Sequence, residues 1–242
     1  MKKYLITGTL LIATLGFAGQ QVRAQETKPS TSSTTTQNKT QFEEWNEDFT
    51  GDKLDEKKWE KFTFEGGSGG KLEVKDGTVK IRSLSKTRAG IRTKEPFSGD
   101  LFVVEARVSK VGAAYPEPGS DASTLGFGGL TILFDGSGRN RIEWIFTSDG
   151  TFEAWAVADG RAERIDNRKL GTKMKNPVLM IVRKGDEFSF YINDPKAAPQ
   201  DAQLGLKATV KNMPKTFHVM LYGYSSSENN WDSVLISTPK QN

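Results

Sequence analysis

The stretch RNRIEWIFTSDGTFEAWAV, residues Arg139–Val157, decides the fold, because apolar and polar side chains alternate on both sides of a turn signal. That signal is Asp149-Gly150, which favours the positive φ angles of a tight β-hairpin. A turn centred on Asp149 makes one face of the hairpin wholly apolar. The facing pairs on it are Phe146 with Phe152, Trp144 with Ala154, and Ile142 with Ala156. The stretch therefore predicts an antiparallel hairpin with one face in the core.

The opposite face of this hairpin carries the polar side chains. It holds Arg141, Glu143, Ile145, Glu153, Trp155 and Val157. A register shifted by one residue would set Phe146 opposite Glu153 and mix apolar with charged side chains, which a half-buried sheet disfavours. Two carboxylates, an arginine and a tryptophan are therefore expected on one face, and that face is the candidate functional surface.

Similar short alternating runs, separated by Gly, Pro, Asn and Asp, recur along the rest of the chain. A second hairpin is expected within residues 71–83, around Asp76-Gly77, and further strands are expected at 101–108, 127–134, 178–183, 187–193, 204–210, 216–224 and 231–237. No run shows a sustained helical period, and residues 158–176 and 225–230 are expected to be loops. Roughly a dozen short strands at turn spacing predict an all-β fold, an antiparallel two-sheet jelly-roll sandwich.

The chain is expected to have three parts. Residues 1–24 have the pattern of a secretory signal peptide, with a charged start, an apolar stretch and a small-x-Ala site ending at Ala24. Residues 25–41 are rich in Ser and Thr and are expected to be a disordered tether, and residues 42–239 are expected to be the jelly-roll domain. The mature protein would then be secreted or periplasmic, with no transmembrane span after signal cleavage, and we expect a monomer.

Charge and cysteine content exclude several classes of function. Three of the 34 basic residues and none of the 30 acidic residues lie in the leader, so its removal lowers the net charge from +4 to +1. The mature domain then has little net charge for the clustered basic face that nucleic-acid binding requires. The chain has no cysteine, which excludes disulfides, thiolate metal sites and cysteine nucleophiles. Its single histidine, His218, excludes a zinc site built on a histidine pair within one chain.

Three stretches carry a family resemblance. EDFTGDKLDEKKWE at Glu47–Glu60 and AGIRTKEPFSGDLFVVEARVSKV at Ala89–Val111 resemble the concanavalin A-like lectin/glucanase superfamily, especially family 16 glycoside hydrolases of the laminarinase type. The closing stretch WDSVLIS, Trp231–Ser237, looks like the last strand of that superfamily. The matching positions of the second stretch are Gly90, Ile91, Thr93, Lys94, Phe97, Glu105, Ala106 and Arg107. The resemblance implies two curved antiparallel sheets with a concave sugar-binding face.

The catalytic motif of that family is not matched. Its members carry Glu-x-Asp-x-x-Glu on one strand, and the three acids serve as nucleophile, assisting carboxylate and general acid. In the nearest stretch here, Glu143–Ser148, only Glu143 matches, because Ile145 stands at the Asp position and no second Glu follows. The resemblance therefore supports the fold and argues against the chemistry of the family.

The hairpin's polar face offers two interpretations of its acids. Glu143 and Glu153 are expected to be diagonal neighbours with Cβ atoms within about 7–8 Å of each other. That spacing fits an acid–base pair, and it equally fits sugar hydrogen bonding or ion pairing with Arg141. Trp155 with Arg141 is the better sugar-binding pair, because an aromatic face packs on the C–H face of a pyranose. The alternative for Trp155 is burial under a loop as part of the core.

Two further residue pairs are candidate ligand contacts. Tyr222 and Tyr224 share one strand face and are expected either to line one end of the groove or to pack at the edge of the sandwich. Asp232 aligns with an acidic position that helps bind a structural calcium in family 16 domains. Asp48 is expected near it because the terminal strands of this fold adjoin, and hard oxygen ligands suit calcium. No other cofactor is expected.

The sequence leaves three function hypotheses. The first is a secreted, non-catalytic, lectin-like domain that binds polysaccharide on a concave sheet face. The second is a divergent glycoside hydrolase that uses Glu143 and Glu153, and the third is a structural or partner-binding envelope domain. Release of sugar product would favour the second hypothesis, and absence of any glycan affinity would favour the third.

Overall fold

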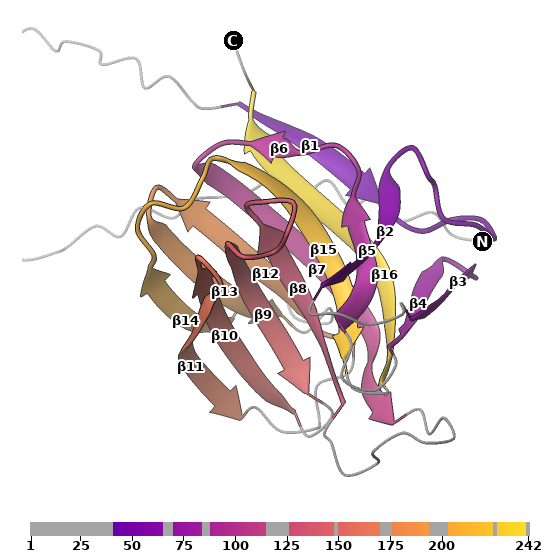
Figure 1. The fold of residues 1–242 in the computed structure, drawn as a ribbon. Coiled ribbons are helices and arrows are strands. Elements are labelled where there is room, and N and C mark those ends of the chain that lie inside the picture. Colours follow the sequence, from indigo (N-terminus) through magenta and orange to yellow (C-terminus); the bar gives the residue numbers. More distant parts are fainter. Residues whose placement is uncertain are drawn as a thin grey trace, which may run out of the picture. The chain divides into compact units, whose positions relative to one another are not determined.

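The computed structural model describes residues 41–64, 70–83, 88–114, 126–147, 150–169, 176–193, 203–224 and 227–240. These residues form sixteen β-strands and no helix (Figure 1). The expected signal peptide, and the expected tether up to residue 40, lie outside the described residues. No helix of the described part has the length and apolar composition needed to cross a membrane.

The strands form two antiparallel sheets of eight strands each. Sheet A contains, in spatial order, β14 (Gln203–Thr209), β13 (Glu187–Asn193), β12 (Val178–Lys184), β7 (Leu101–Ala114), β16 (Ser227–Pro239), β4 (Thr78–Arg82) and β3 (Lys71–Lys75), with β1 (Phe42–Glu47) paired to β16. Sheet B contains β11 (Arg161–Lys169), β10 (Thr151–Ala158), β9 (Arg141–Thr147), β8 (Phe127–Leu133), β15 (Thr216–Tyr224), β5 (Arg88–Thr93) and β2 (Trp59–Phe64), with β6 (Phe97–Ser98) paired to β15. The predicted all-β, two-sheet sandwich is confirmed.

The central hairpin forms in the register expected from its sequence. Phe146 of β9 lies opposite Phe152 of β10, and the pairing continues without a shift as far as Arg141 and Val157. Gly150 supplies the positive φ angle of the turn, at 79°. The alternation of side chains alone therefore fixed which face of β9 and β10 enters the core.

The inner faces of the two sheets share one hydrophobic core, and Figure 1 shows the sheets stacked face to face. Aromatic rings bridge the layers. Trp144 of sheet B lies 5.3 Å from Phe190 of sheet A between ring centroids, and Phe102 of sheet A lies 4.2 Å from Phe217 of sheet B. The indole N–H of Trp144 also donates to the carbonyl oxygen of Tyr191 at 3.1 Å. Trp144 is therefore a core residue, as its place on the apolar face predicted.

Two predicted loops are strands. β11 occupies much of 158–176, because an edge strand gains its backbone hydrogen bonds from β10 and needs few apolar side chains. β16 begins at Ser227 instead of Trp231. Ser227 and Asn229 near its start are buried and hydrogen-bonded, since Ser227 Oγ and Asn229 Nδ2 donate to the carbonyl oxygen of Phe127 at 3.0 and 3.3 Å. Polar composition therefore did not mark the true ends of these strands.

The turn between β8 and β9 is built around the Asp135 carboxylate. Its Oδ1 accepts hydrogen bonds from the backbone N–H and hydroxyl of Ser137 and from the N–H of Arg139, at 2.9–3.1 Å. Its Oδ2 accepts from the backbone and side-chain nitrogens of Asn140, at 2.7 and 2.8 Å. Partial burial works to raise the pKa of Asp135, but these hydrogen bonds hold that pKa below its usual value.

The Asp135 carboxylate is expected to make stability depend on pH. Because its folded-state pKa lies below the unfolded value of about 3.9, its contribution is present above that pH and is lost as the pH falls. We expect Asp135→Asn to reduce the free energy of unfolding by about 1–2 kcal/mol at neutral pH. Urea titrations between neutral pH and pH ~3 should show the gap to wild type shrinking. Exposed Asp52→Asn is the control, and a gap that stays constant with pH would contradict the assignment.

Candidate functional site

The outer face of sheet B gathers the polar side chains that the hairpin presents. Residues that pair across neighbouring strands form a row of side chains that crosses seven strands of the sheet. The next row on the same face lies two residues further along each strand. The row through the hairpin comprises Glu60, Arg92, Met220, Thr131, Glu143, Trp155 and Arg164. Residues far apart in the sequence thus meet on one surface.

A pocket of about 180 Å³ opens on this face over β9 and β10. Its lining residues are Arg88, Phe127, Arg141, Glu143, Ile145, Thr147, Glu153, Trp155, Val157 and Ala162. Four residues predicted as ligand contacts, Arg141, Glu143, Glu153 and Trp155, line it together. A cavity of roughly 150 Å³ holds a six-membered ring such as benzene, so this pocket has room for one ring.

Glu143 is a buried carboxylate held by three side chains. It is 1% exposed, and Arg141 Nε donates to its Oε1. Its Oε2 accepts from the Tyr222 hydroxyl at 3.2 Å and lies 3.7 Å from Nη2 of Arg88. Arg141 is itself buried and also donates through Nη1 to the carbonyl oxygen of Gly138 at 2.7 Å. This arrangement fixes the carboxylate and engages both of its oxygens.

Tyr222 supports Glu143 from beneath and is fully buried. Its ring lies over Gly129 of the neighbouring strand, where an added Cβ would come within 2.5 Å of the ring. Burial, reinforced by the nearby Glu143 carboxylate, raises the pKa of Tyr222 well above its usual value, so the hydroxyl stays protonated and donates. The structure therefore gives Tyr222 contact with Glu143, and its ligand contact stays a prediction.

Trp155 and Glu153 form the wall of the pocket on β10. The indole N–H of Trp155 donates to Glu153 Oε2 at 2.9 Å, and Arg164 Nη1 lies 3.6 Å from Glu153 Oε1. Trp155 is half-buried, so part of its ring faces the pocket. Glu153 lies opposite Ile145 and Trp155 opposite Glu143, which makes the two acids diagonal neighbours as predicted.

Sequence reasoning missed Arg88 and Phe127. Both line the pocket: Phe127 comes from β8, which pairs directly with β9, and Arg88 comes from β5, which is joined to β8 through β15. Tyr224 lies beside them, and its ring stacks on Phe127 with centroids 4.6 Å apart. Gly128 and Gly129 of β8 were a sequence signal of close packing at this strand, because glycine inside a strand often marks a site where another group approaches the backbone.

The proposed calcium ligands do not assemble a metal site from acidic side chains. β1 and β16 do pair, and Asp48 directly follows β1, whose last residue, Glu47, lies opposite Val234, two residues from Asp232. Asp232 Oδ1 accepts from the Ser109 hydroxyl at 2.6 Å, and Asp48 Oδ1 accepts from the Thr50 hydroxyl at 2.9 Å. Across the described residues, no group of three or more acidic or histidine side chains is placed to hold a metal. Calcium binding stays a prediction.

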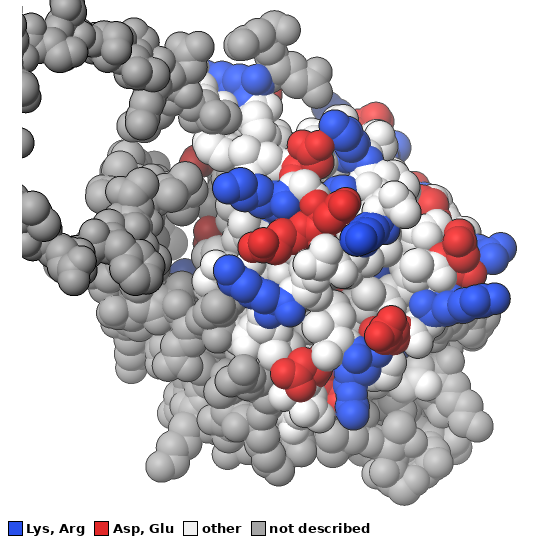
Figure 2. Space-filling model, turned by 90° about the vertical axis from the view of Figure 1, so that its left-hand side faces the viewer, with Lys and Arg blue, Asp and Glu red and all other residues white. Residues whose placement is uncertain are grey.

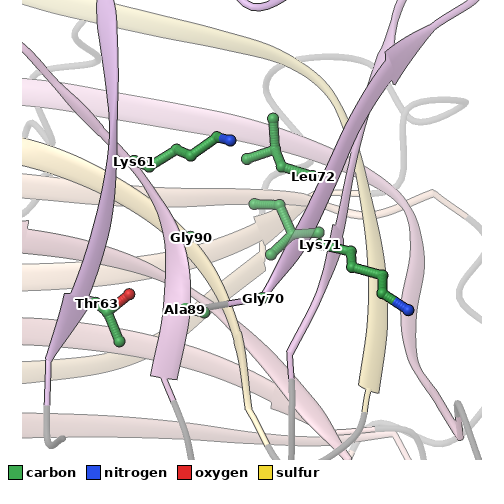
Figure 3. Close-up of a pocket in the computed structure, with 8 residues that line it drawn as sticks. Lys61, Thr63, Gly70, Lys71, Leu72, Ala89 and Gly90 are labelled. Carbon is green, nitrogen blue, oxygen red and sulfur yellow. The ribbon is translucent and has the colours of Figure 1, made fainter. Parts of the chain in front are cut away.

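A second cavity, of about 40 Å³, lies where β2 and β5 face β3 and β4 (Figure 3). Lys61 of β2 lines it and extends in the direction of Leu72 on β3. The cavity is much too small for a sugar ring. A lysine that points inward from an edge strand discourages that strand from pairing with another chain. We therefore assign this cavity a structural role.

The side of the domain where β11 and β14 are the edge strands carries charges of both signs. Figure 2 shows Lys and Arg interspersed with Asp and Glu over the described part of this side, without a large patch of one sign. Cross-strand pairs contribute to the pattern, including Lys207 with Glu187 at 3.6 Å between Nζ and Oε1. The described part of this side therefore lacks the clustered basic surface that a nucleic-acid phosphate backbone would require.

Solved structures with the same fold include a glucanase, an agarase and a CBM2 module. The catalytic domain of an endo-1,3-beta-glucanase (laminarinase) from Thermotoga petrophila RKU-1 matches with a TM-score of 0.60 and 12% identity, over 84% of this chain and 100% of that chain. Beta-agarase B from Zobellia galactanivorans matches with a TM-score of 0.57 and 13% identity, over 84% and 95%. The CBM2 module of the evolved Dit of Lactobacillus casei BL23 phage J-1 matches with a TM-score of 0.55 and 13% identity, over 84% and 99%.

These matches establish a concanavalin A-like jelly roll, as the sequence resemblance predicted. No family sequence profile matches the chain, and no curated protein sequence matches it. At such low identity the likeness shows the fold alone, so the function has to be argued from the pocket itself.

Proposed function

We propose that this chain is a secreted carbohydrate-binding domain that holds a glycan in the pocket of sheet B without hydrolysing it. One observation carries the proposal: a half-buried tryptophan borders a ring-sized pocket next to Arg141, Glu143 and Glu153. An indole face packs against the C–H face of a sugar, and fixed polar groups beside it accept and donate hydrogen bonds to hydroxyls.

The surroundings of the two acids favour binding over hydrolysis. A retaining glycosidase needs two carboxyl groups about 5–5.5 Å apart, one of them free to protonate the leaving oxygen. Glu143 is 1% exposed and is held by Arg141 and Tyr222, while Glu153 is held by Trp155. Ile145 occupies the position of the assisting acid, so β9 presents a single carboxylate on this face.

Trp155→Ala is expected to lower affinity for glycans at least tenfold, or about 1.4 kcal/mol, because the packing surface for the sugar ring is lost. Affinity for soluble β-glucans, galactans and xylans would be measured by titration calorimetry, with reducing ends assayed in the same samples. Trp155→Phe is the matched control and should retain most of the affinity. Product release by the wild type would establish the hydrolase alternative, and no affinity for any of these glycans would refute the proposal for them.

A further inference from the structure

The outer face of sheet A, on the opposite side of the domain from the pocket, carries a patch of apolar side chains. An antiparallel sheet with one solvated face normally presents polar side chains on that face. Here five half-buried apolar side chains from four neighbouring strands point outward, and none of them belongs to the hydrophobic core. They are Leu101 of β7, Met180 and Val182 of β12, Tyr191 of β13 and Leu235 of β16. We call these five residues the apolar patch.

One row of side chains that crosses this patch is symmetric in polarity about its centre. From β1 to β14, its members are Glu44, Ser237, Val103, Val182, Ser189 and Lys207. Two valines form the centre, a serine lies outside each valine, and an exposed charged residue lies at each end. The two end charges have opposite signs, so the row is complementary to a second copy of itself.

A two-fold axis that runs parallel to the strands, between β7 and β12, brings two such rows together. The two copies then lie face to face with valine on valine and serine on serine, and Glu44 of each copy lies opposite Lys207 of the other. In the next row, the same axis places Leu235 opposite Tyr191 and Glu105 opposite Met180. Sheets that stack in this way keep their strands aligned within about 30° and lie about 10 Å apart. Glutamate and lysine side chains are long enough to meet across that spacing.

The charges on this face fit a second copy. Glu44 and Glu105 lie on the side of β1 and β7, and burial, reinforced by Glu44 and opposed by Arg107, raises the pKa of Glu105 above its usual value. A cation brought close to Glu44 by a second chain relieves the repulsion between these two acids. Lys207 Nζ lies 3.6 Å from Glu187 Oε1, but both side chains are more than half exposed, and such pairs contribute little. Lys207 can therefore interact with a second acid at little cost.

The size of the face suits a weak, reversible dimer. The six strands from β1 to β14 and four rows of side chains cover roughly 24 by 20 Å, or about 500 Å² on each copy. The total of about 1,000 Å² lies at the lower end of specific protein–protein interfaces, where association is transient.

We propose that a second copy of this chain binds to the outer face of sheet A, in a two-fold dimer held by the apolar patch and by two Glu44–Lys207 ion pairs between the copies. The pockets on sheet B of the two copies then face away from the interface, so the dimer presents two of them. The sequence alone led us to expect a monomer, and the oligomeric state decides between the two. The inference does not depend on what the pockets bind.

The test is sedimentation velocity of the whole protein from about 5 to 500 μM at low ionic strength, where we expect a dimer with a dissociation constant in the micromolar range. Val182→Lys should weaken association at least tenfold, because it places a charge at the centre of the apolar patch. Glu44→Lys and Lys207→Glu, both at exposed positions, should each weaken self-association at least fivefold, because two attractive pairs become repulsive. Arg161→Glu, on β11 of sheet B, is the matched control and should leave association unchanged.

A mixture of the two charge variants tests the arrangement of the copies. Glu44→Lys and Lys207→Glu, combined in equal amounts, should associate about as strongly as the wild type, because both ion pairs then form between opposite charges. A mixture that stays as weak as the single variants would contradict the two-fold alignment of the rows. A wild type that stays monomeric at the highest concentration, or a dimer that Val182→Lys leaves unchanged, would overturn the inference. None of these outcomes alters the expected binding of glycans at Trp155.

Discussion

Replacing Glu143 with alanine is expected to reduce the free energy of unfolding by about 3–5 kcal/mol, the cost of breaking a buried ion pair by removing one partner. Arg141 is 6% exposed and has its Nε on Glu143, so the variant leaves a buried guanidinium without its carboxylate. The Tyr222 hydroxyl, fully buried, also loses its acceptor. Both losses affect buried groups, and a buried charge or hydroxyl that loses its partner costs stability.

The size of this effect is measured by urea unfolding at neutral pH, with Glu153→Ala as the matched control. Glu153 lies on the same face, but its side chain is 22% exposed and its Arg164 partner is 51% exposed, so its loss should cost under about 1 kcal/mol. A double variant, Arg141→Met with Glu143→Leu, should recover much of the stability because apolar side chains replace the buried Arg141–Glu143 ion pair. Equal costs for Glu143→Ala and Glu153→Ala would contradict a structural role for the buried cluster.

The stability of the Glu143 variants also helps to define the role of Glu143 in function. If the main role of Glu143 is to neutralise the charge of Arg141 and to position Tyr222, its removal disrupts the local structure of the pocket. Loss of glycan binding is then an indirect effect. A nucleophile would behave differently, because its removal abolishes turnover while leaving the fold largely intact. Measuring stability and glycan binding on the same Glu143 variants therefore distinguishes two interpretations. In one, Glu143 is a structural acid in a binding site, and in the other it is a residue of a degenerate active site.

The sequence was most informative where the contacts are local. The β9–β10 register follows from the alternation on both sides of one turn, and four pocket residues share that hairpin, so their proximity was predictable. Arg88 was not predictable, because β5 reaches this surface only through β15, which follows it by more than a hundred residues and separates it from β8. Pairing between strands that far apart depends on the whole core, which no short stretch encodes.

Burial was harder to predict than position. Tyr222 sits on the predicted strand face, yet it is fully covered, since Gly129 lets its ring lie flat across β8 and reach Glu143. The charged β11 is a strand where the sequence predicts a loop, because an edge strand shows little apolar alternation. In both cases the burial or secondary structure of the residue depends on which residues lie next to it in the folded protein.

Arg183 offers the clearest test of how the two sheets are joined at one end. It lies on β12 and is 2% exposed, and its guanidinium carbon is 5.2 Å from the Phe134 ring and 5.3 Å from the Phe188 ring. Burial lowers the pKa of Arg183 below its usual value, against the opposing influence of Asp100 and Asp186. Arginine nevertheless remains charged at neutral pH, so this is a buried cation stacked between aromatic rings.

The hydrogen bonds of Arg183 tie two separate connections together. Its Nε donates to the carbonyl oxygen of Gly185 at 2.8 Å, in the turn between β12 and β13. Its Nη2 donates to the carbonyl oxygen of Met213 at 2.7 Å, and its Nη1 donates to that of Pro214, both in the segment that leads into β15. One side chain therefore links a turn of sheet A to the segment that leads into β15 of sheet B.

Arg183→Met is expected to reduce the free energy of unfolding by roughly 3–5 kcal/mol, because three carbonyl groups lose a charged donor at once. Methionine keeps the length and apolar contact of the side chain, so the loss reports on the donors more than on packing. Arg183→Lys should also destabilise, since a single ammonium cannot reproduce the planar fork that reaches three acceptors. Denaturant midpoints with unchanged m-values give the measurement, and exposed Arg161→Met should stay within about 0.5 kcal/mol of wild type. A methionine variant as stable as the wild type would mean that water satisfies these carbonyls, and that the two sheets are held at this end by the aromatic contacts alone.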